Sequence, residues 1–339
     1  MNPNEPPISH MLNNDPPDHT RLRRPLARAF TARRVEELRP RIEQIADELL
    51  DAMAGRDEVD LVADYALPLP VTVICELLGV PERDRADLRR WSTALTTAGK
   101  VVTGRTAGMA ITAYFARLVE DKRRDPGDDL LSALIRDSAD QLSEHELMST
   151  AVLLLTAGHE TTVQLIANGA LALLRHPDQL AALRADRSLL PGAVEEFLRH
   201  DGPLTTATGR IAAEPVEIGG VTIPRGESVF VGLGSANRDA ARFPDPDACR
   251  WTGMPPVISR SGTGSTTASE RRWPGWRARS PSSGCSTASR RWRWRPTTWS
   301  TGRHDCSAAL PRCPFDLVVD LVLHRAVLRR PVPDPRALP

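Results

Sequence analysis

The composition of the 339-residue chain changes abruptly after residue 247. Residues 248–339 hold 16 arginines, no lysine and five acidic residues, which gives them a net charge of +11. Residues 1–247 hold 28 basic and 38 acidic residues, a net charge of −10. Six of the seven tryptophans and four of the five cysteines also lie after residue 247. We therefore expect a globular region over residues 1–247 and a tail, residues 248–339, that is not a native domain.

Hydrophobic periodicity predicts a mainly helical fold with a small β element for the first 247 residues. Apolar residues recur at helical spacing from Val35 to Leu50, inside a predicted helix over residues 20–53. Further helices are predicted over residues 68–96 with a break at Pro81, and over residues 106–124, 143–174 and 192–200. Two short β-branched segments, 216–218 and 221–223, flank Gly219-Gly220 and predict a hairpin, and a further strand is expected over residues 228–231. Residues 248–339 follow neither period.

Several classes of protein are disfavoured by the same sequence. The longest apolar segment, Leu147 to Ala157, is too short to span a membrane, and the polar, proline-rich start is unlike a signal peptide. The five cysteines show neither a CxxC pair nor zinc-ligand spacing. We therefore expect a cytoplasmic bacterial protein without a membrane span, a disulfide framework or a metal site built by its cysteines.

The first candidate site is the segment Asp15 to Arg24, where two prolines form a turn that leads into a helix. His19 and Arg23 are four residues apart on that helix and face the same way. Together they could bind an anionic group such as a carboxylate. The alternative is that they belong to a solvated basic face.

The second candidate site is the segment Ala157 to Thr162 within the long apolar helix. Gly158 allows another group to approach the backbone closely. Glu160 and Thr161 place an acid beside an alcohol, a pair that can relay protons. The alternative is that Glu160 lies on an exposed face and that Thr161 bonds back to a helix carbonyl. We favour the functional interpretation, because an apolar helix leaves little exposed face.

Two weaker signals lie further along the chain. Glu196 and Arg199 have the i,i+3 spacing of a helical ion pair, and Arg210 precedes the hairpin. Each is common in proteins, so neither alone identifies a site. The order of the four signals is more specific than any one of them.

Taken in that order, the segments resemble the soluble bacterial cytochromes P-450, especially the actinomycete type that tailors secondary metabolites. The resemblance covers about residues 8–247. It implies a haem-dependent monooxygenase that inserts one oxygen atom from O₂ into a small organic substrate. Electrons would come from NAD(P)H through a ferredoxin and its reductase, and neither nucleic acid nor a membrane is an expected partner.

The resemblance also implies roles for individual residues. His19, Arg23 and Arg210 match positions that contact the haem propionates. The helix that carries Ala157 and Gly158 crosses the distal face of the haem, and the positions of Glu160 and Thr161 deliver protons during oxygen activation. Glu196 and Arg199 match a buried structural ion pair.

Two departures from the family pattern affect activity. The family normally has several dozen more residues before the first segment, so the chain is expected to be truncated at the N-terminus. A Phe-Gly-x-Gly-x-x-x-Cys loop, whose thiolate binds the haem iron, should follow residues 243–247 and is absent. With the axial cysteine missing, we expect weak or no haem binding and an inactive chain.

A frameshift would explain the missing loop. When residues 259–270 are written in GC-rich codons and read from the third base of each preceding codon, they encode Leu-Ala-Phe-Gly-His-Gly-Ile-His-His-Cys-Leu-Gly. Restoring one C after the codon of Asp247 brings this frame into register and changes Ala248-Cys249 to Arg-Leu. We therefore infer that one base was lost after the codon of Asp247.

The alternative from another functional class is a non-catalytic helical protein. In that case the basic, tryptophan-rich tail would bind nucleic acid or anionic partners. A haem absorbance spectrum would separate the two hypotheses.

Overall fold

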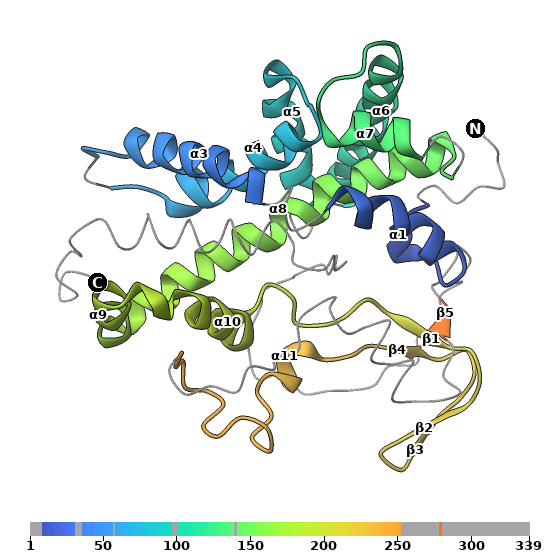
Figure 1. Cartoon of the computed structure of the whole chain (residues 1–339). Helices are drawn as coiled ribbons and strands as arrows, with labels where there is room; N and C mark the ends of the chain where they lie inside the picture. Colours follow the sequence, from blue (N-terminus) through green and yellow to red (C-terminus); the bar gives the residue numbers. More distant parts are fainter. Residues whose placement is uncertain are drawn as a thin grey trace.

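The computed structural model describes residues 9–30, 36–56, 58–96, 101–138 and 141–251, and the backbone of residues 278–279. Helices dominate the described part (Figure 1). The helices are η1 (Met11–Asn13), α1 (Asp18–Ala29), α3 (Arg39–Ala52), η2 (Val62–Ala66), α4 (Pro68–Leu77), α5 (Glu82–Thr96), α6 (Val101–Arg124), α7 (Leu130–Asp137), α8 (Glu144–Arg175), α9 (Pro177–Ala185), η3 (Arg187–Leu189), α10 (Leu190–Asp201) and α11 (Leu233–Ala236). The strands are β1 (Arg210–Ala212), β2 (Val216–Ile218), β3 (Val221–Ile223), β4 (Ser228–Val229) and β5 (Ala278–Arg279).

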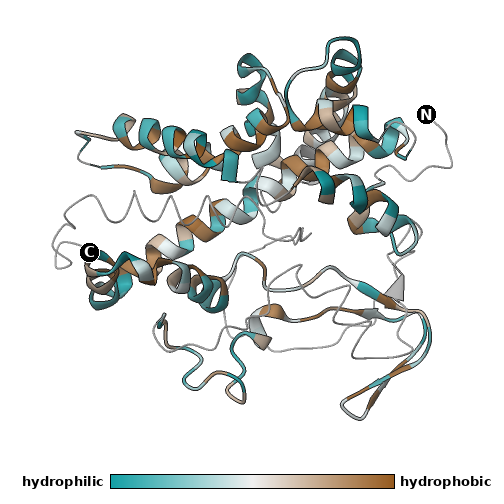
Figure 2. Cartoon of the chain, in the orientation of Figure 1, coloured by the Kyte–Doolittle hydropathy of each residue, from teal (hydrophilic) through white to brown (hydrophobic). Residues whose placement is uncertain are grey.

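Helix α8 is 32 residues long and runs diagonally through the molecule (Figure 1). Its N-terminal half packs with α1, α4, α6 and α7 in one hydrophobic cluster, and its middle packs with α3, η2 and α4 in a second. Its C-terminal part packs with α9 and α10 in a third cluster. Apolar residues line the inward sides of these helices, and polar residues cover the outer turns of α3 and α5 (Figure 2). This arrangement is the amphipathic pattern that the sequence predicts.

The ends of several helices follow local rules that are visible in the sequence. Ser143 and Glu146 form a reciprocal capping box at the start of α8. Helix α4 ends at Leu77, and the chain turns through Gly79, whose φ of +63° favours glycine, before Pro81. The break expected at Pro81 therefore separates α4 from α5.

The β element is small and antiparallel. Strands β2 and β3 form the predicted hairpin, with φ values of +58° and +77° at Gly219 and Gly220. Strand β1 pairs with β4 on one side and with β5 on the other, and Arg210 lies opposite Val229. The fold class predicted from the sequence, mainly α with a small β element, is confirmed.

The structure differs from the sequence prediction near the start. Instead of one helix over residues 20–53, it has α1 and α3, and residues 31–35 between them lie outside the described residues. Leu22 and Leu26 of α1 pack in the first cluster, whereas Ile42 and Ile45 of α3 pack in the second. The two helices therefore pack in different parts of the core.

Packing also continues past residue 247. Cys249 and Trp251 are buried, and the Trp251 ring lies edge-on to Phe197 with 5.6 Å between the ring centroids. The packed residues therefore extend four positions beyond the expected boundary. The rest of the expected tail lies outside the described residues, apart from the backbone of β5.

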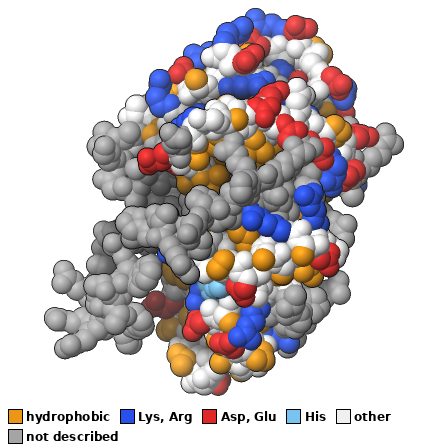
Figure 3. All heavy atoms as spheres, turned by 90° about the vertical axis from the view of Figure 1, so that its left-hand side faces the viewer, with side chains coloured by type: hydrophobic (Ala, Val, Ile, Leu, Met, Phe, Trp, Pro, Cys, Tyr) orange, Lys and Arg blue, Asp and Glu red, His pale blue; other side chains and the backbone are white. Residues whose placement is uncertain are grey.

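The surface of the described part carries both signs of charge. On the face shown in Figure 3, basic and acidic side chains are interspersed. Among the helices described, none is long and apolar enough to cross a membrane.

A buried ion pair connects three elements around the end of α6. Lys122 Nζ lies 2.6 Å from Asp129 Oδ2, and the side chains are 10% and 8% exposed. Asp129 also caps α7 by accepting from the backbone N–H and the hydroxyl of Ser132. A Cβ at Gly79 would lie 2.3 Å from Lys122 Nζ, so the α4–α5 turn packs directly on this pair. The pair therefore fixes α7 and the α4–α5 turn against α6.

Replacing Asp129 by alanine should destabilise the protein by about 3–5 kcal/mol, because it leaves the Lys122 ammonium buried without a partner. Urea unfolding measures the change in the free energy of unfolding. Asp121→Ala is the matched control, since its carboxylate is 69% exposed where it pairs with Arg124. The control should change stability by about 0.5 kcal/mol or less. Equal losses in both variants would contradict the structural role of the buried pair.

Candidate functional site

One face of helix α8 is left partly open. Between positions 152 and 171 the half-buried or exposed residues recur every three or four positions, as on one side of a helix. They are Val152, Thr156, Ala157, Glu160, Thr161, Gln164, Ala167, Asn168 and Leu171. Gly158 and His159 lie at its edge and are buried. The face therefore brings together Ala157, Glu160 and Thr161 from the second candidate segment.

Glu160 and Thr161 are placed differently on this face. The Glu160 side chain is 33% exposed, so its carboxylate is not a buried charge, and α8 has more exposed face than its apolar sequence led us to expect. Thr161 Oγ1 donates to the carbonyl of Ala157 at 3.2 Å, as the structural alternative anticipated. This back-bond does not remove the hydroxyl from the open face. The acid and the alcohol remain adjacent on the part of α8 that is not committed to the core.

The sequence reasoning did not single out His159, which is fully buried between α8 and α5. Its Nε2 lies 3.0 Å from Ser92 Oγ, and its Nδ1 lies 2.7 Å from the carbonyl oxygen of Leu155. Burial lowers the pKa of this histidine. A histidine in an apolar helix was the available signal, but its partner lies 67 residues away in the chain.

The basic residues expected to bind an anion come from two elements. His19 and Arg23 are half-buried on α1, and Arg210 is half-buried at the start of β1. Arg210 donates to the carbonyl and hydroxyl of Thr208. Within the part of the chain that the structure describes, neither Arg23 nor Arg210 pairs with a carboxylate. In the view of Figure 1, α1 and β1 occupy the same side of the molecule.

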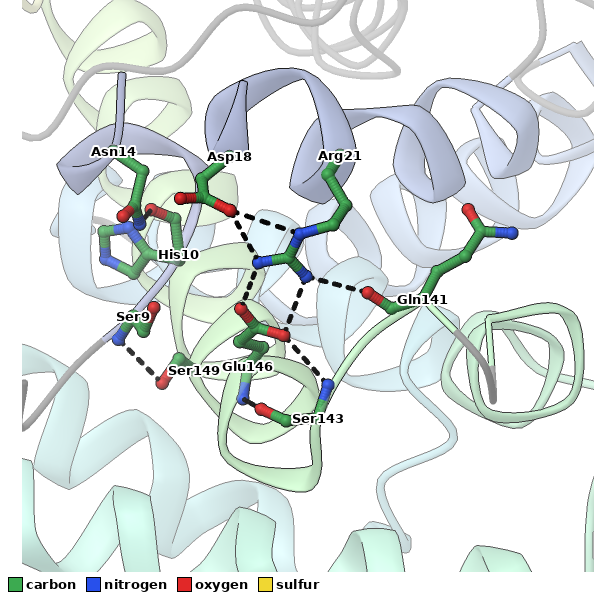
Figure 4. A network of polar contacts seen from close by, with 9 residues as sticks. All are labelled: Ser9, His10, Asn14, Asp18, Arg21, Gln141, Ser143, Glu146 and Ser149. Atoms are coloured by element: carbon green, nitrogen blue, oxygen red, sulfur yellow. Dashed lines mark hydrogen bonds and ion pairs between the residues drawn. The ribbon is translucent and has the colours of Figure 1, made fainter. Parts of the chain in front are cut away.

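Arg21 fixes α1 relative to the start of α8 (Figure 4). Its guanidinium lies 2.6 Å from Glu146 Oε1 and 3.0 Å from Asp18 Oδ1, and it also donates to the carbonyl of Gln141. Glu146 in turn accepts from the backbone N–H of Ser143. Hydrogen bonding to Arg21 lowers the pKa of the Glu146 carboxyl. The helix that carries His19 and Arg23 is thus tied to the capping box of the helix that carries Glu160.

Glu196 and Arg199 form a buried ion pair on α10, with both side chains 1% exposed. Arg199 Nε and Nη2 donate to the carboxylate at 2.6 and 2.8 Å. The guanidinium also donates to the carbonyls of Asn237, Pro246 and Ala248. Its centre lies 5.3 Å from the centroid of the Phe243 ring. The pair therefore fixes residues 237–248, the loop from which the family's cysteine loop would continue.

Two cysteines lie among the described residues, and both are buried. Burial raises the pKa of Cys75 to about 12 and that of Cys249 to about 11. Cys75 packs in the first hydrophobic cluster and Cys249 in the third. Both thiols are therefore committed to the hydrophobic core. Over the described ranges, no three metal-binding side chains form a cluster.

Comparison with known proteins accounts for this combination of features. The family model for cytochrome P-450 matches residues 105–250. The tirandamycin C-bound P-450 monooxygenase TamI is a solved structure that is 40% identical, with a TM-score of 0.74, and the match covers 97% of this chain and 73% of that one. The chain belongs to the cytochrome P-450 family. The expected family is thereby confirmed.

Curated relatives give the same result. Cytochrome P-450 107B1 of Saccharopolyspora erythraea is 57% identical over 240 residues, which cover 70% of this chain and 59% of that protein. Cytochrome P-450 monooxygenase PikC of Streptomyces venezuelae is 53% identical over 248 residues, covering 71% of this chain and 60% of that protein. The chain thus spans about 60% of the length of these curated relatives.

Cytochromes P-450 are haem proteins, and the described residues fit the haem in part. Arg23 and Arg210 lack carboxylate partners among these residues and suit the propionates, and the open face of α8 suits the distal side of the ring. Cys75 and Cys249 are packed in hydrophobic clusters rather than on the open face of α8. Side chains that would suit the distal and propionate sides of a haem are therefore present among the described residues, and a ligand for the iron is not found among them.

The Glu146–Arg21 contact should make stability depend on pH. Because Arg21 lowers the pKa of Glu146 below its ordinary value of 4.5, the contact stabilises the fold fully above that value. Its contribution is lost as the pH falls through the folded-state pKa. The difference in unfolding free energy between wild type and Glu146→Gln should be about 1 kcal/mol or less near pH 7 and should shrink below pH 4. A difference that grows in acid would contradict the assignment.

Removing the guanidinium of Arg199 should have a much larger effect. Arg199→Ala should lower the free energy of unfolding by about 3–5 kcal/mol, because the Glu196 carboxylate would stay buried without its partner. Arg199→Lys should recover little of the loss, since one ammonium cannot match five donors in a fixed fork. Thermal and urea unfolding measure the stability of both variants. Arg238→Ala is the control, because the paired side chains of Arg238 and Asp247 are 40% and 80% exposed. An Arg199→Ala variant as stable as that control would show that the pair is not structural.

Proposed function

We propose that residues 9–251 are the part of a cytochrome P-450 monooxygenase that covers the distal face of the haem and holds its propionates. The observation that carries this proposal is the placement of Glu160 and Thr161 on the half-exposed face of α8. Arg23 and Arg210, which have no carboxylate partner among the described residues, supply the positive charge that propionates need, and His19 is a further polar group on the helix of Arg23. The complete enzyme would insert one oxygen atom from O₂ into a C–H or C=C bond of a small organic substrate.

Each of these residues has a definite task in the complete enzyme. When bound, haem would supply the redox chemistry that activates dioxygen. Glu160 is exposed enough to exchange protons with water, and the Thr161 hydroxyl can turn from the Ala157 carbonyl to pass a proton onward. Ala157 and Gly158 shape the surface that the ring faces. A ferredoxin and its reductase would supply electrons from NAD(P)H in the cytoplasm.

We further propose that the chain itself is inactive because its reading frame changes after Asp247. The abrupt change of composition supports this, and so does the end of the family match at residue 250. The burial of Cys249 gives independent support: the position is 3% exposed within an apolar cluster, and the restored frame places leucine there. The sequence encoded after the change of frame would then supply no thiolate.

The chain of 339 residues should bind added haem weakly. Its reduced carbon monoxide complex should lack the red-shifted Soret band that thiolate ligation produces in this family. Arg23→Ala should weaken haem binding by up to about fivefold, because a partly exposed ion pair contributes about 1 kcal/mol or less. Absorbance titration with haem measures both effects. Arg24→Ala is the matched control, since Arg24 is the exposed neighbour on the same helix and should leave affinity unchanged.

Restoring one base after the codon of Asp247, with the N-terminal region that the family resemblance implies, should produce the red-shifted band. If the unrepaired chain already shows that band, another cysteine is the ligand and the proposed loss of function is wrong. If Arg23→Ala and Arg24→Ala weaken binding equally, the propionate assignment is wrong, whatever the state of the reading frame.

A further inference from the structure

A hydrogen bond between side chains joins α5 to α8 directly beside the acid–alcohol pair. Ser92 Oγ on α5 lies 3.0 Å from His159 Nε2 on α8. Ser92 is 1% exposed and His159 is fully buried, in a region that is otherwise apolar. A polar contact in such surroundings is costly to leave unmade, because each group would lose its partner without gaining water. The bond therefore fixes how α5 sits on α8.

The direction of this bond follows from the other ring nitrogen. His159 Nδ1 lies 2.7 Å from the carbonyl oxygen of Leu155, which can only accept, so Nδ1 carries a hydrogen. Burial disfavours the charged ring, so Nε2 carries none. The Ser92 hydroxyl is then the donor and Nε2 the acceptor. Both nitrogens of a neutral imidazole are satisfied, and the ring orientation is fixed from two sides.

The next residue along α8 is Glu160. Its Oε2 lies 3.9 Å from His159 Nε2, which is too far for a hydrogen bond but close enough for one after a small movement. While Ser92 occupies the Nε2 lone pair, the ring offers Glu160 no N–H. The Glu160 carboxylate then stays on the half-exposed face of α8 without a hydrogen bond to the ring. Without Ser92, Nε2 could take up a proton while Nδ1 keeps its hydrogen on the Leu155 carbonyl, and the resulting imidazolium could pair with the Glu160 carboxylate.

We propose that Ser92 and His159 are positioning residues that hold α5 on α8 and keep the imidazole from binding Glu160. Through this link, the position of α5 determines whether the Glu160 carboxylate is free on the open face or bound to the imidazole. Helix α5 packs along α6, and the link joins α5 to α8 at His159, within the turn from Gly158 to Thr161. The consequence for proton delivery rests on the proposed role of Glu160, whereas the link itself does not.

The test uses the full 339-residue chain without haem, so it is independent of catalysis. Nitrogen-15 NMR of the histidine rings, with the His159 signals assigned by their loss in His159→Gln, reports the tautomer. Wild type should show His159 with a protonated Nδ1 and an unprotonated Nε2. In Ser92→Ala, the Nε2 signal should move toward the protonated form, and amide hydrogen exchange in α5 should accelerate about tenfold. Ser92→Thr, which keeps the hydroxyl, should restore the wild-type tautomer.

Thr93→Ala is the matched control, because the Thr93 hydroxyl is exposed and donates to the Arg89 carbonyl of its own helix. It should leave the His159 tautomer and the α5 exchange rates unchanged. The proposal is overturned if His159 is protonated on Nε2 in the wild type. It is also overturned if Ser92→Ala and Thr93→Ala behave alike. Should Ser92→Ala not fold, the wild-type tautomer and the Ser92→Thr spectrum still decide the matter.

Discussion

Helix α8 contributes to all three hydrophobic clusters of the described structure, and the packing of the other helices depends on this shared helix. Leu153 lies in the first cluster, Val163 in the second and Leu165 in the third. Because residues on its other faces pack in these clusters, one face of the helix is left partly exposed. Glu160 and Thr161 lie on that face. The position of the candidate site is therefore a consequence of how the core is built.

The second constraint is the buried guanidinium of Arg199. Such a charge is tolerated only if its donors are satisfied, and here they are satisfied by Glu196 and by three backbone carbonyls. The backbone of residues 237–248 must therefore be in place for α10 to pack. The family match ends at residue 250, just beyond this network. A change of reading frame just after Asp247 would thus spare the network and replace the residues on its C-terminal side.

Features set by local physics could be predicted from the sequence. The capping box at Ser143, the break before Pro81 and the two-glycine hairpin all appear as expected. The division between α1 and α3 was missed because apolar spacing continues across it, while the two helices pack in different clusters. The contact between Ser92 and His159 was missed because it joins residues 67 positions apart. Pairings of that kind depend on tertiary packing, which periodicity does not encode.

The most direct measurement is the sequence of the source DNA across codons 240–270. If one base is missing after the codon of Asp247, the shifted frame should encode Phe-Gly-His-Gly-Ile-His-His-Cys where this chain has residues 261–268. The core, the distal face and the Arg199 network would then belong to a cytochrome P-450 whose ligand loop and C-terminal segment were lost through the frameshift. Codons that do not encode a Phe-Gly-x-Gly-x-x-x-Cys loop in any frame would contradict this explanation and make the basic tail a genuine part of the protein.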